Sequence, residues 1–155
     1  MALMKMPCAV GSGSVPQKIT LNGTAGGNMT PAANAFDGDT STKAYIAGGS
    51  GYLTYQFPTA QKVNVFGIRG NTDNPPLSPT AVEIKASNDG GTTWDKLAYG
   101  GDFADTEMRY CVAINDTAYT LYRFDCTGRD GGAGVGTYAQ VSQIEMYYID
   151  GLNFS

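Results

Sequence analysis

The stretch Tyr52-Leu-Thr-Tyr-Gln-Phe57 places an apolar side chain at every second position, at Leu53, Tyr55 and Phe57. A period of two is that of a β-strand with one buried face, because successive side chains of a strand point to opposite sides. The polar residues between them then face solvent. We therefore predict a strand over residues 52–57 that covers a hydrophobic core with one face.

Further stretches rich in β-branched and aromatic residues lie on both sides of this strand. They are residues 18–21, 63–69, 81–87, 93–97, 109–114, 119–126 and 141–148. The chain also holds 21 Gly, 7 Pro and 10 Tyr, a composition typical of short strands joined by turns. We predict an all-β fold, an eight-stranded antiparallel jelly-roll β-sandwich.

A length of 155 residues allows one sizeable core and is too short for two ordinary domains. We predict that residues 17–150 form the sandwich, residues 1–16 an N-terminal extended arm or linker, and residues 151–155 a C-terminal tail. The apolar run at the start is broken by Lys5 and Pro7, so we expect no secretory signal peptide. An arm of this kind is suited to docking on a neighbouring molecule.

Composition excludes several function classes. Only 15% of residues are charged, the net charge is −4 and the cations are scattered, which argues against nucleic-acid binding. No apolar stretch approaches the roughly twenty residues that a membrane-spanning helix needs, so we expect no membrane insertion. With no His and no carboxylates paired across a cleft, we predict that the protein is not an enzyme.

Three cysteines, Cys8, Cys111 and Cys126, fit neither a zinc site nor a disulfide framework by their spacing. We predict that they are reduced apolar side chains. A bridge between Cys111 and Cys126 remains an alternative, because the two lie on strands that we expect to be neighbours.

Five motifs follow one another along the chain: Asn34-Ala-Phe-Asp-Gly-Asp-Thr-Ser-Thr42, Tyr52-Leu-Thr-Tyr-Gln-Phe57, Val65-Phe-Gly-Ile68, Val82-Glu-Ile-Lys-Ala-Ser-Asn-Asp-Gly-Gly-Thr-Thr-Trp94 and Gln143-Ile-Glu-Met-Tyr147. In this order they resemble the discoidin superfamily, which includes the coagulation-factor C domains and the family 32 carbohydrate-binding modules. The resemblance covers about residues 18–148. It implies a galactose-binding-domain-like sandwich, in agreement with the strand pattern.

The resemblance also implies a structural calcium ion in the first motif. The ligands would be a carbonyl of Asn34, the carboxylate of Asp37, a carbonyl or carboxylate of Asp39, the carbonyl and hydroxyl of Thr42, and the carboxylate of Glu145. Hard oxygen donors with two or more charges are what Ca²⁺ requires. The alternative is an Asp-Gly turn with solvated carboxylates, which is common in β-proteins.

A ligand site is implied on loops at one tip of the sandwich, where related modules place an aromatic ring against a sugar. By position, Arg69, Asn74 and Tyr138 correspond to the expected arginine, asparagine and ring. The expected histidine is absent, and residues 46–51 stand in its place. For each candidate a structural role is the alternative: an ion pair at a strand end for Arg69, a turn residue for Asn74 and a core or rim aromatic for Tyr138. Tyr45 and Trp94 are expected to be structural, with Tyr45 in the core.

Two functions from different classes fit these observations. The first is a non-catalytic, calcium-stabilised assembly module of a bacteriophage particle, a head decoration or a tail or fibre protein that contacts surface glycans. It would form a homo-oligomer or bind other virion proteins through residues 1–15. The alternative is a stand-alone, lectin-like carbohydrate-binding module of a bacterial glycan-degrading or adhesion system, located outside the cell.

Overall fold

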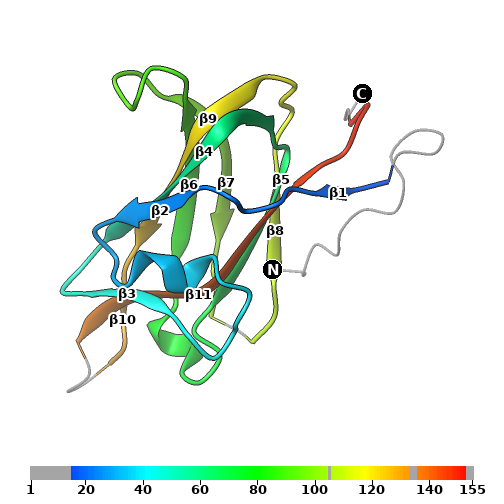
Figure 1. The fold of residues 1–155 in the computed structure, drawn as a ribbon. Coiled ribbons are helices and arrows are strands. Elements are labelled where there is room, and N and C mark those ends of the chain that lie inside the picture. Colours follow the sequence, from blue (N-terminus) through cyan, green and yellow to red (C-terminus); the bar gives the residue numbers. More distant parts are fainter. Residues whose placement is uncertain (1–14, 105, 133–135, 153–155) are drawn as a thin grey trace.

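The computed structural model describes residues 15–104, 106–132 and 136–152. Within them the chain forms two antiparallel sheets, and Figure 1 shows the two layers of the sandwich. Sheet A consists, in spatial order, of β1 (Gln17–Lys18), β11 (Thr137–Tyr148), β5 (Val65–Gly70) and β8 (Arg109–Val112), with β3 (Ala44–Ala47) and β10 (Arg129–Asp130) also paired to β11. Sheet B consists of β2 (Thr24–Gly27), β4 (Gly51–Lys62), β9 (Ala118–Thr127), β6 (Ala81–Ser87) and β7 (Asp95–Gly101). Two short 3-10 helices are η1 (Ala32–Ala35) and η2 (Pro75–Leu77). The predicted all-β sandwich is confirmed.

All eight predicted strands are present, and the described residues hold three more, β2, β3 and β10. Each of the three is two to four residues long and pairs with part of a longer strand. Two of them fall in the segments 44–51 and 127–137, which the Gly-rich sequence presents as loops. A period of two cannot be recognised in so few residues, so only pairing with β11 or β4 defines these strands.

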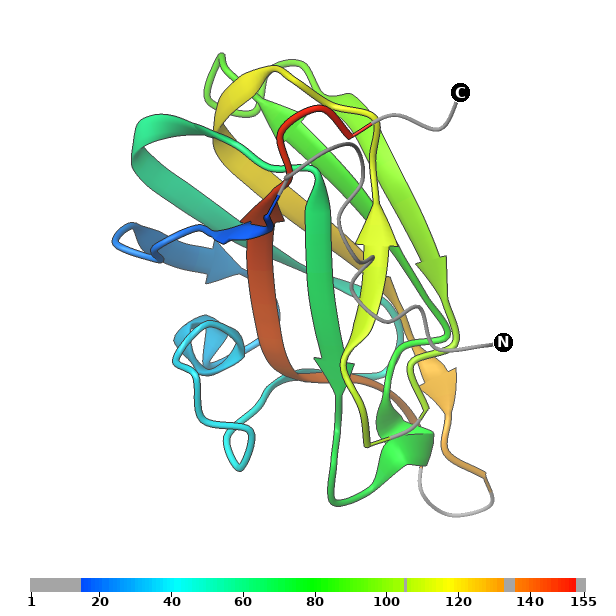
Figure 2. The same cartoon turned by 90° about the vertical axis from the view of Figure 1, so that its right-hand side faces the viewer.

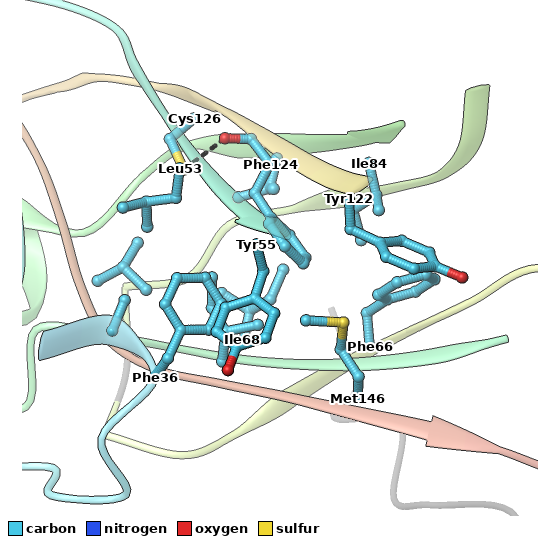
Figure 3. Close-up of a cluster of buried hydrophobic side chains, with 14 of the residues drawn as sticks. Phe36, Leu53, Tyr55, Phe66, Ile68, Ile84, Tyr122, Phe124, Cys126 and Met146 are labelled. Atoms are coloured by element: carbon cyan, nitrogen blue, oxygen red, sulfur yellow. Dashed lines mark hydrogen bonds between the residues drawn. The ribbon is translucent and has the colours of Figure 1, made fainter. Parts of the chain in front are cut away.

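Aromatic side chains from both sheets fill the space between the layers, as Figure 3 shows. Tyr122 and Phe124 of β9 reach across from sheet B to Phe66 of β5, with ring centroids 5.9 and 6.0 Å apart. Tilted and edge-to-face rings at these distances contribute beyond the apolar area that they bury. Also buried, as predicted, are Leu53, Tyr55 and Phe57.

The two described cysteines are buried and unbridged. Burial raises the pKa of the Cys111 thiol to about 11 and that of Cys126 to about 12, where burial is joined by the nearby Asp125. The prediction of reduced thiols is confirmed for Cys111 and Cys126, whereas Cys8 lies outside the described residues. The expectation that Cys111 and Cys126 lie on neighbouring strands is wrong, because β8 belongs to sheet A and β9 to sheet B.

A second apolar cluster lies on the outward face of sheet A, away from the main core. Val65 packs there with Ile149 and Leu152 from the segment after β11. The buried side chain of Asn64 fixes that segment: its Nδ2 donates to the Ile149 carbonyl and its Oδ1 accepts from the Ile149 amide, both at 2.9 Å. The chain thus folds back to cover its own sheet.

The connections at the two ends of the sandwich differ. Figure 2 shows η2, β10 and the loop after η1 at the lower end, and the turn between β6 and β7 at the upper end. The lower end therefore brings together the acidic loop and the connections predicted to bind a ligand. Among the described residues, no helix is long and apolar enough to cross a membrane.

Candidate functional site

The acidic loop after η1 gathers oxygen atoms around the hydroxyl of Thr42. Thr42 Oγ1 lies 2.7 Å from Asp37 Oδ2, 2.9 Å from the carbonyl oxygen of Asp39 and 3.3 Å from that of Asn34. Gly38, with φ 79°, supplies the left-handed backbone that the turn needs. Four of the five predicted metal ligands therefore lie together.

The carboxylate of Asp39 is used within the loop itself. Its Oδ1 accepts hydrogen bonds from the hydroxyl of Ser41 at 2.6 Å and from the Ser41 amide at 2.9 Å. These two bonds hold the pKa of Asp39 below its usual 3.8. The Asp39 oxygen that stands beside Thr42 is therefore the backbone carbonyl.

The fifth predicted ligand, Glu145 of β11, already has two partners. Its Oε1 lies 3.3 Å from Lys18 Nζ, and its Oε2 accepts a hydrogen bond from the hydroxyl of Tyr147. Asp37 and Glu145 nevertheless line the same surface pocket, of about 350 Å³. Gln143 lines it as well, and its buried Oε1 accepts no hydrogen bond. An unused acceptor of this kind is suited to a cation or a donor group in the pocket.

This donor set fits a calcium ion in the loop. Asp37 supplies a carboxylate, and Asn34, Asp39 and Thr42 supply neutral oxygens, which is the hard-donor chemistry that Ca²⁺ takes. The described residues contain no group of three or more His, Cys, Asp and Glu side chains near enough to share a metal. A metal here would therefore rest largely on carbonyl and hydroxyl oxygens, while Lys18 neutralises Glu145.

The acidic loop also supports the connection between β5 and η2. Thr72 Oγ1 donates to the carbonyl of Thr40 at 3.3 Å, and Lys43 Nζ lies 3.4 Å from Asp73 Oδ2. These contacts join the predicted metal loop to the predicted ligand loop. Anything that orders the first loop will therefore help to order the second.

Arg69, Asn74 and Tyr138, the predicted ligand residues, have different surroundings. Arg69 donates through Nη1 to the carbonyl of Thr106 at 2.9 Å, while its buried Nε has no hydrogen-bond partner. Asn74 precedes η2, and its backbone N–H donates to Asn71 Oδ1 at 3.2 Å, as expected of a turn residue. Tyr138 is half-buried on β11. One nitrogen of the Arg69 guanidinium is thus used in a hydrogen bond within the protein.

Other residues make up the outward surface where β3 pairs with β11. Tyr45 stands opposite Gln140, and Tyr138 opposite Ala47, so these side chains share one face. Asn71 Nδ2 donates to Gln140 Oε1 at 2.5 Å, which fixes the amide beside the rings. We call Tyr45, Tyr138, Gln140 and Asn71 the tip patch, in which Tyr45 is exposed, Tyr138 is half-buried, and Gln140 and Asn71 are buried.

The prediction that Tyr45 is a core residue is wrong, because its side chain is 47% exposed. Ala44 takes the inward position instead and is fully buried. The core position of Tyr45 was implied by the family resemblance. A strand of four residues such as β3 leaves the choice of face open in the sequence. Gln140 and Asn71 had no sequence signal at all, since their pairing depends on the meeting of two distant segments.

Comparison with known proteins establishes the family and the fold. The family model named "F5/8 type C domain" matches residues 18–141. The chain belongs to the F5/8 type C domain family. No curated protein matches this F5/8 type C domain in sequence.

Solved structures share its fold. A family 32 carbohydrate-binding module from C. perfringens NanJ, in complex with galactose, is 20% identical with TM-score 0.70, covering 86% of this chain and 100% of that one. The CBM32 of AlyQ, in complex with 4,5-unsaturated mannuronic acid, is 15% identical with TM-score 0.70, covering 85% and 98%. Chitosan-binding module 1 of a Paenibacillus sp. IK-5 chitosanase/glucanase is 21% identical with TM-score 0.64, covering 83% and 96%. At these identities the likeness establishes the fold.

Proposed function

We propose that this F5/8 type C domain is a non-catalytic carbohydrate-binding module that holds a sugar on the tip patch. The observation that carries the proposal is the exposed ring of Tyr45, which shares an outward face with Tyr138 beside a fixed pair of amides. Structural neighbours that were solved with galactose and with an unsaturated mannuronic acid support it. The alternative function predicted from the sequence is thus preferred over the virion role.

The chemistry of the tip patch suits a polyol. A tyrosine ring presents an apolar face to the C–H groups of a sugar, and amides exchange hydrogen bonds with its hydroxyls. Asn71 Oδ1 accepts from the amides of Asp73 and Asn74, and Gln140 Oε1 accepts from Asn71. Gln140 Nε2 and the second N–H of Asn71 Nδ2 remain to donate to a ligand, at side chains that are buried at the base of the patch.

Calorimetric titration with galactose and N-acetylgalactosamine tests this function. We expect binding by the wild type and at least a tenfold weaker affinity for Tyr45→Ala, because removing the ring removes its contact with the sugar. Ile114→Ala, which alters another exposed apolar side chain, is the control and should bind as the wild type does. Equal affinity of Tyr45→Ala and wild type would exclude the tip patch as the site.

We also propose that the acidic loop binds Ca²⁺ as a structural ion through Asn34, Asp37, Asp39 and Thr42. When bound, the ion would replace the hydrogen bonds of the Thr42 hydroxyl and stiffen the loop that supports residues 71–74. Ligands that bind only the folded state stabilise it by about 2.7 kcal/mol at a hundred times their dissociation constant. The melting temperature should therefore rise with added CaCl2 and fall back with a chelator.

Asp37→Asn should remove the effect of calcium on the melting temperature, because it removes the carboxylate nearest to Thr42. Asp116→Asn changes a carboxylate that pairs with Lys62 instead, so it should keep the full effect. A wild-type melting temperature that does not respond to calcium would count against the ion while leaving the sugar site untouched.

The predicted virion role, homo-oligomer and location rest on residues 1–15, of which residues 1–14 lie outside the described residues. They stay predictions. Mass measurement under gentle conditions, with and without these residues, would test the oligomer directly.

A further inference from the structure

The outward face of sheet B carries a groove on the side of the sandwich away from sheet A. Its volume is about 530 Å³. Strands β4, β6, β7 and β9 all contribute side chains to it. None of the tip patch residues lines it, so it is a separate feature of the molecule.

The strand registers align four of the lining residues in one row across the sheet. Tyr52 pairs with Asp125, Asp125 with Glu83, and Glu83 with Tyr99. Side chains at paired positions lie on the same face, so two aromatic rings stand at the ends of a row with two carboxylates between them. Four adjacent strands at about 4.8 Å spacing separate the outer rings by roughly 14 Å.

Both rings line the groove, Tyr99 exposed and Tyr52 half-buried. The ring of Tyr99 is 69% exposed on the edge strand β7, which is unusual for so large an apolar group. Tyr52 is held from one side, because the guanidinium of Arg123 lies 4.0 Å from its ring centroid. Such a cation–π contact holds the ring in place before a ligand binds, so that binding does not have to order the ring.

The charges along the row are balanced by the next row of the sheet. Lys85 Nζ lies 3.1 Å from Glu83 and 2.8 Å from Asp125. Arg123 Nε lies 2.8 Å from Asp125, and Lys96 Nζ lies 3.1 Å from Glu83. A charged ligand would have to break these pairs, whereas hydroxyl groups add to them, since a paired carboxylate keeps lone pairs to accept further hydrogen bonds.

We propose that this groove is a second glycan site, which binds an uncharged linear oligosaccharide lying across the strands from Tyr52 to Tyr99. The rings stack on two sugar units, and Glu83 and Asp125 accept hydrogen bonds from hydroxyls between them. A length of roughly 14 Å suits several sugar units rather than one. The inference shares only the ligand class with the proposed function, and its residues are different.

The test is a titration of isotope-labelled wild-type protein with β-1,4-linked tetrasaccharides of glucose, xylose, mannose and N-acetylglucosamine, followed by NMR. We expect at least one tetrasaccharide to shift the amide signals of residues around Tyr52, Glu83, Tyr99 and Arg123. Tyr99→Ala should weaken that affinity at least tenfold. Gln56→Ala, on the same face but outside the row, is the matched control and should bind as the wild type does.

Each outcome is decisive. Shifts confined to the tip patch, or equal binding by Tyr99→Ala and wild type, would overturn the groove as a site while keeping the proposed function. Shifts confined to the groove would support it and leave the tip patch to the galactose titration. The absence of shifts with all four tetrasaccharides would overturn the groove, and the galactose titration would then decide the tip patch alone.

Discussion

The two outward faces of the sandwich are built in opposite ways. On sheet A, the chain covers its own strands: Val65 is fully buried beneath Ile149 and Leu152, and Asn64 satisfies the backbone of that cover. On sheet B, the corresponding face is left open, with an exposed Tyr99 and paired charges. One face thus contributes stability, and the other keeps groups available for a partner.

The two faces differ in whether their polar side chains are buried or partly solvated. The side chain of Asn64 is buried and forms two hydrogen bonds to Ile149. Its loss would leave the backbone N–H and C=O of Ile149 without partners in an apolar environment. Lys85 and Asp125 on sheet B keep about a quarter of their side chains exposed, so water can replace part of what a lost partner supplied. Substitutions on the two faces should therefore differ strongly in their effect on the free energy of unfolding.

The largest effect is expected for Asn64→Ala, at about 3 kcal/mol, because it leaves the buried N–H and C=O of Ile149 unpaired. Asn88→Ala is a matched control: Asn88 also bonds one carbonyl and one amide, those of Ala118 and Thr120, but in solvent. It should cost below about 1 kcal/mol, since water replaces the lost bonds. Urea unfolding measures both, and equal losses would contradict the contrast between the faces.

Val65→Ala should cost about 2 kcal/mol, because two methyl groups are lost from a fully buried site and leave a cavity. Thermal and urea unfolding of the single variant would measure the loss. A change within about 0.5 kcal/mol, the range of surface positions, would mean that the cover on sheet A adds little to stability.

Asp125→Asn should cost less than about 1 kcal/mol at pH 7, because its ion pairs are partly solvated. Burial alone would raise the pKa of Asp125, but hydrogen bonds from Lys85 and Arg123 outweigh it and hold the pKa below 3.8. Hydrogen bonds from Lys85 and Lys96 lower the pKa of Glu83 below 4.5.

A lowered carboxyl pKa stabilises the fold above the unfolded value and is lost as the pH falls through the folded value. The difference between wild type and Asp125→Asn should thus shrink as the pH falls below the usual 3.8 and through the lowered pKa of Asp125. Hydrogen bonds from Asp125 and Glu83 raise the pKa of Lys85 above 10.5, so its contribution persists below that pH and is lost on further alkalinisation. A difference that does not depend on pH in the acid range would contradict the role of the pairs.

The smallest effect on stability is expected for Tyr99→Ala, within about 0.5 kcal/mol, because its side chain is mostly exposed. The substitution should weaken oligosaccharide binding instead, so that this one residue separates binding from stability. A loss of 2 kcal/mol or more in urea unfolding would show that Tyr99 serves the fold.

Much of the fold follows from local patterns. The alternation at Leu53, Tyr55 and Phe57 correctly identifies β4, although the strand runs from Gly51 to Lys62 because its pairing with β9 continues past an irregularity between Gln56 and Gln61. The acidic loop is also local: Asn34, Asp37, Asp39 and Thr42 lie within nine residues, and the structure brings them together. Patterns of this length need no distant partner.

Only the tertiary structure decided the features that depend on how distant strands pair. The sequence by itself determined the sandwich and the acidic loop, since hydrophobic period and turn chemistry act over a few residues. It did not place Tyr45 at the surface, separate Cys111 from Cys126, or align Tyr52 with Tyr99 across four strands. A shift of one residue in any pairing would turn these side chains to the other face, and only the packed sheets exclude that shift.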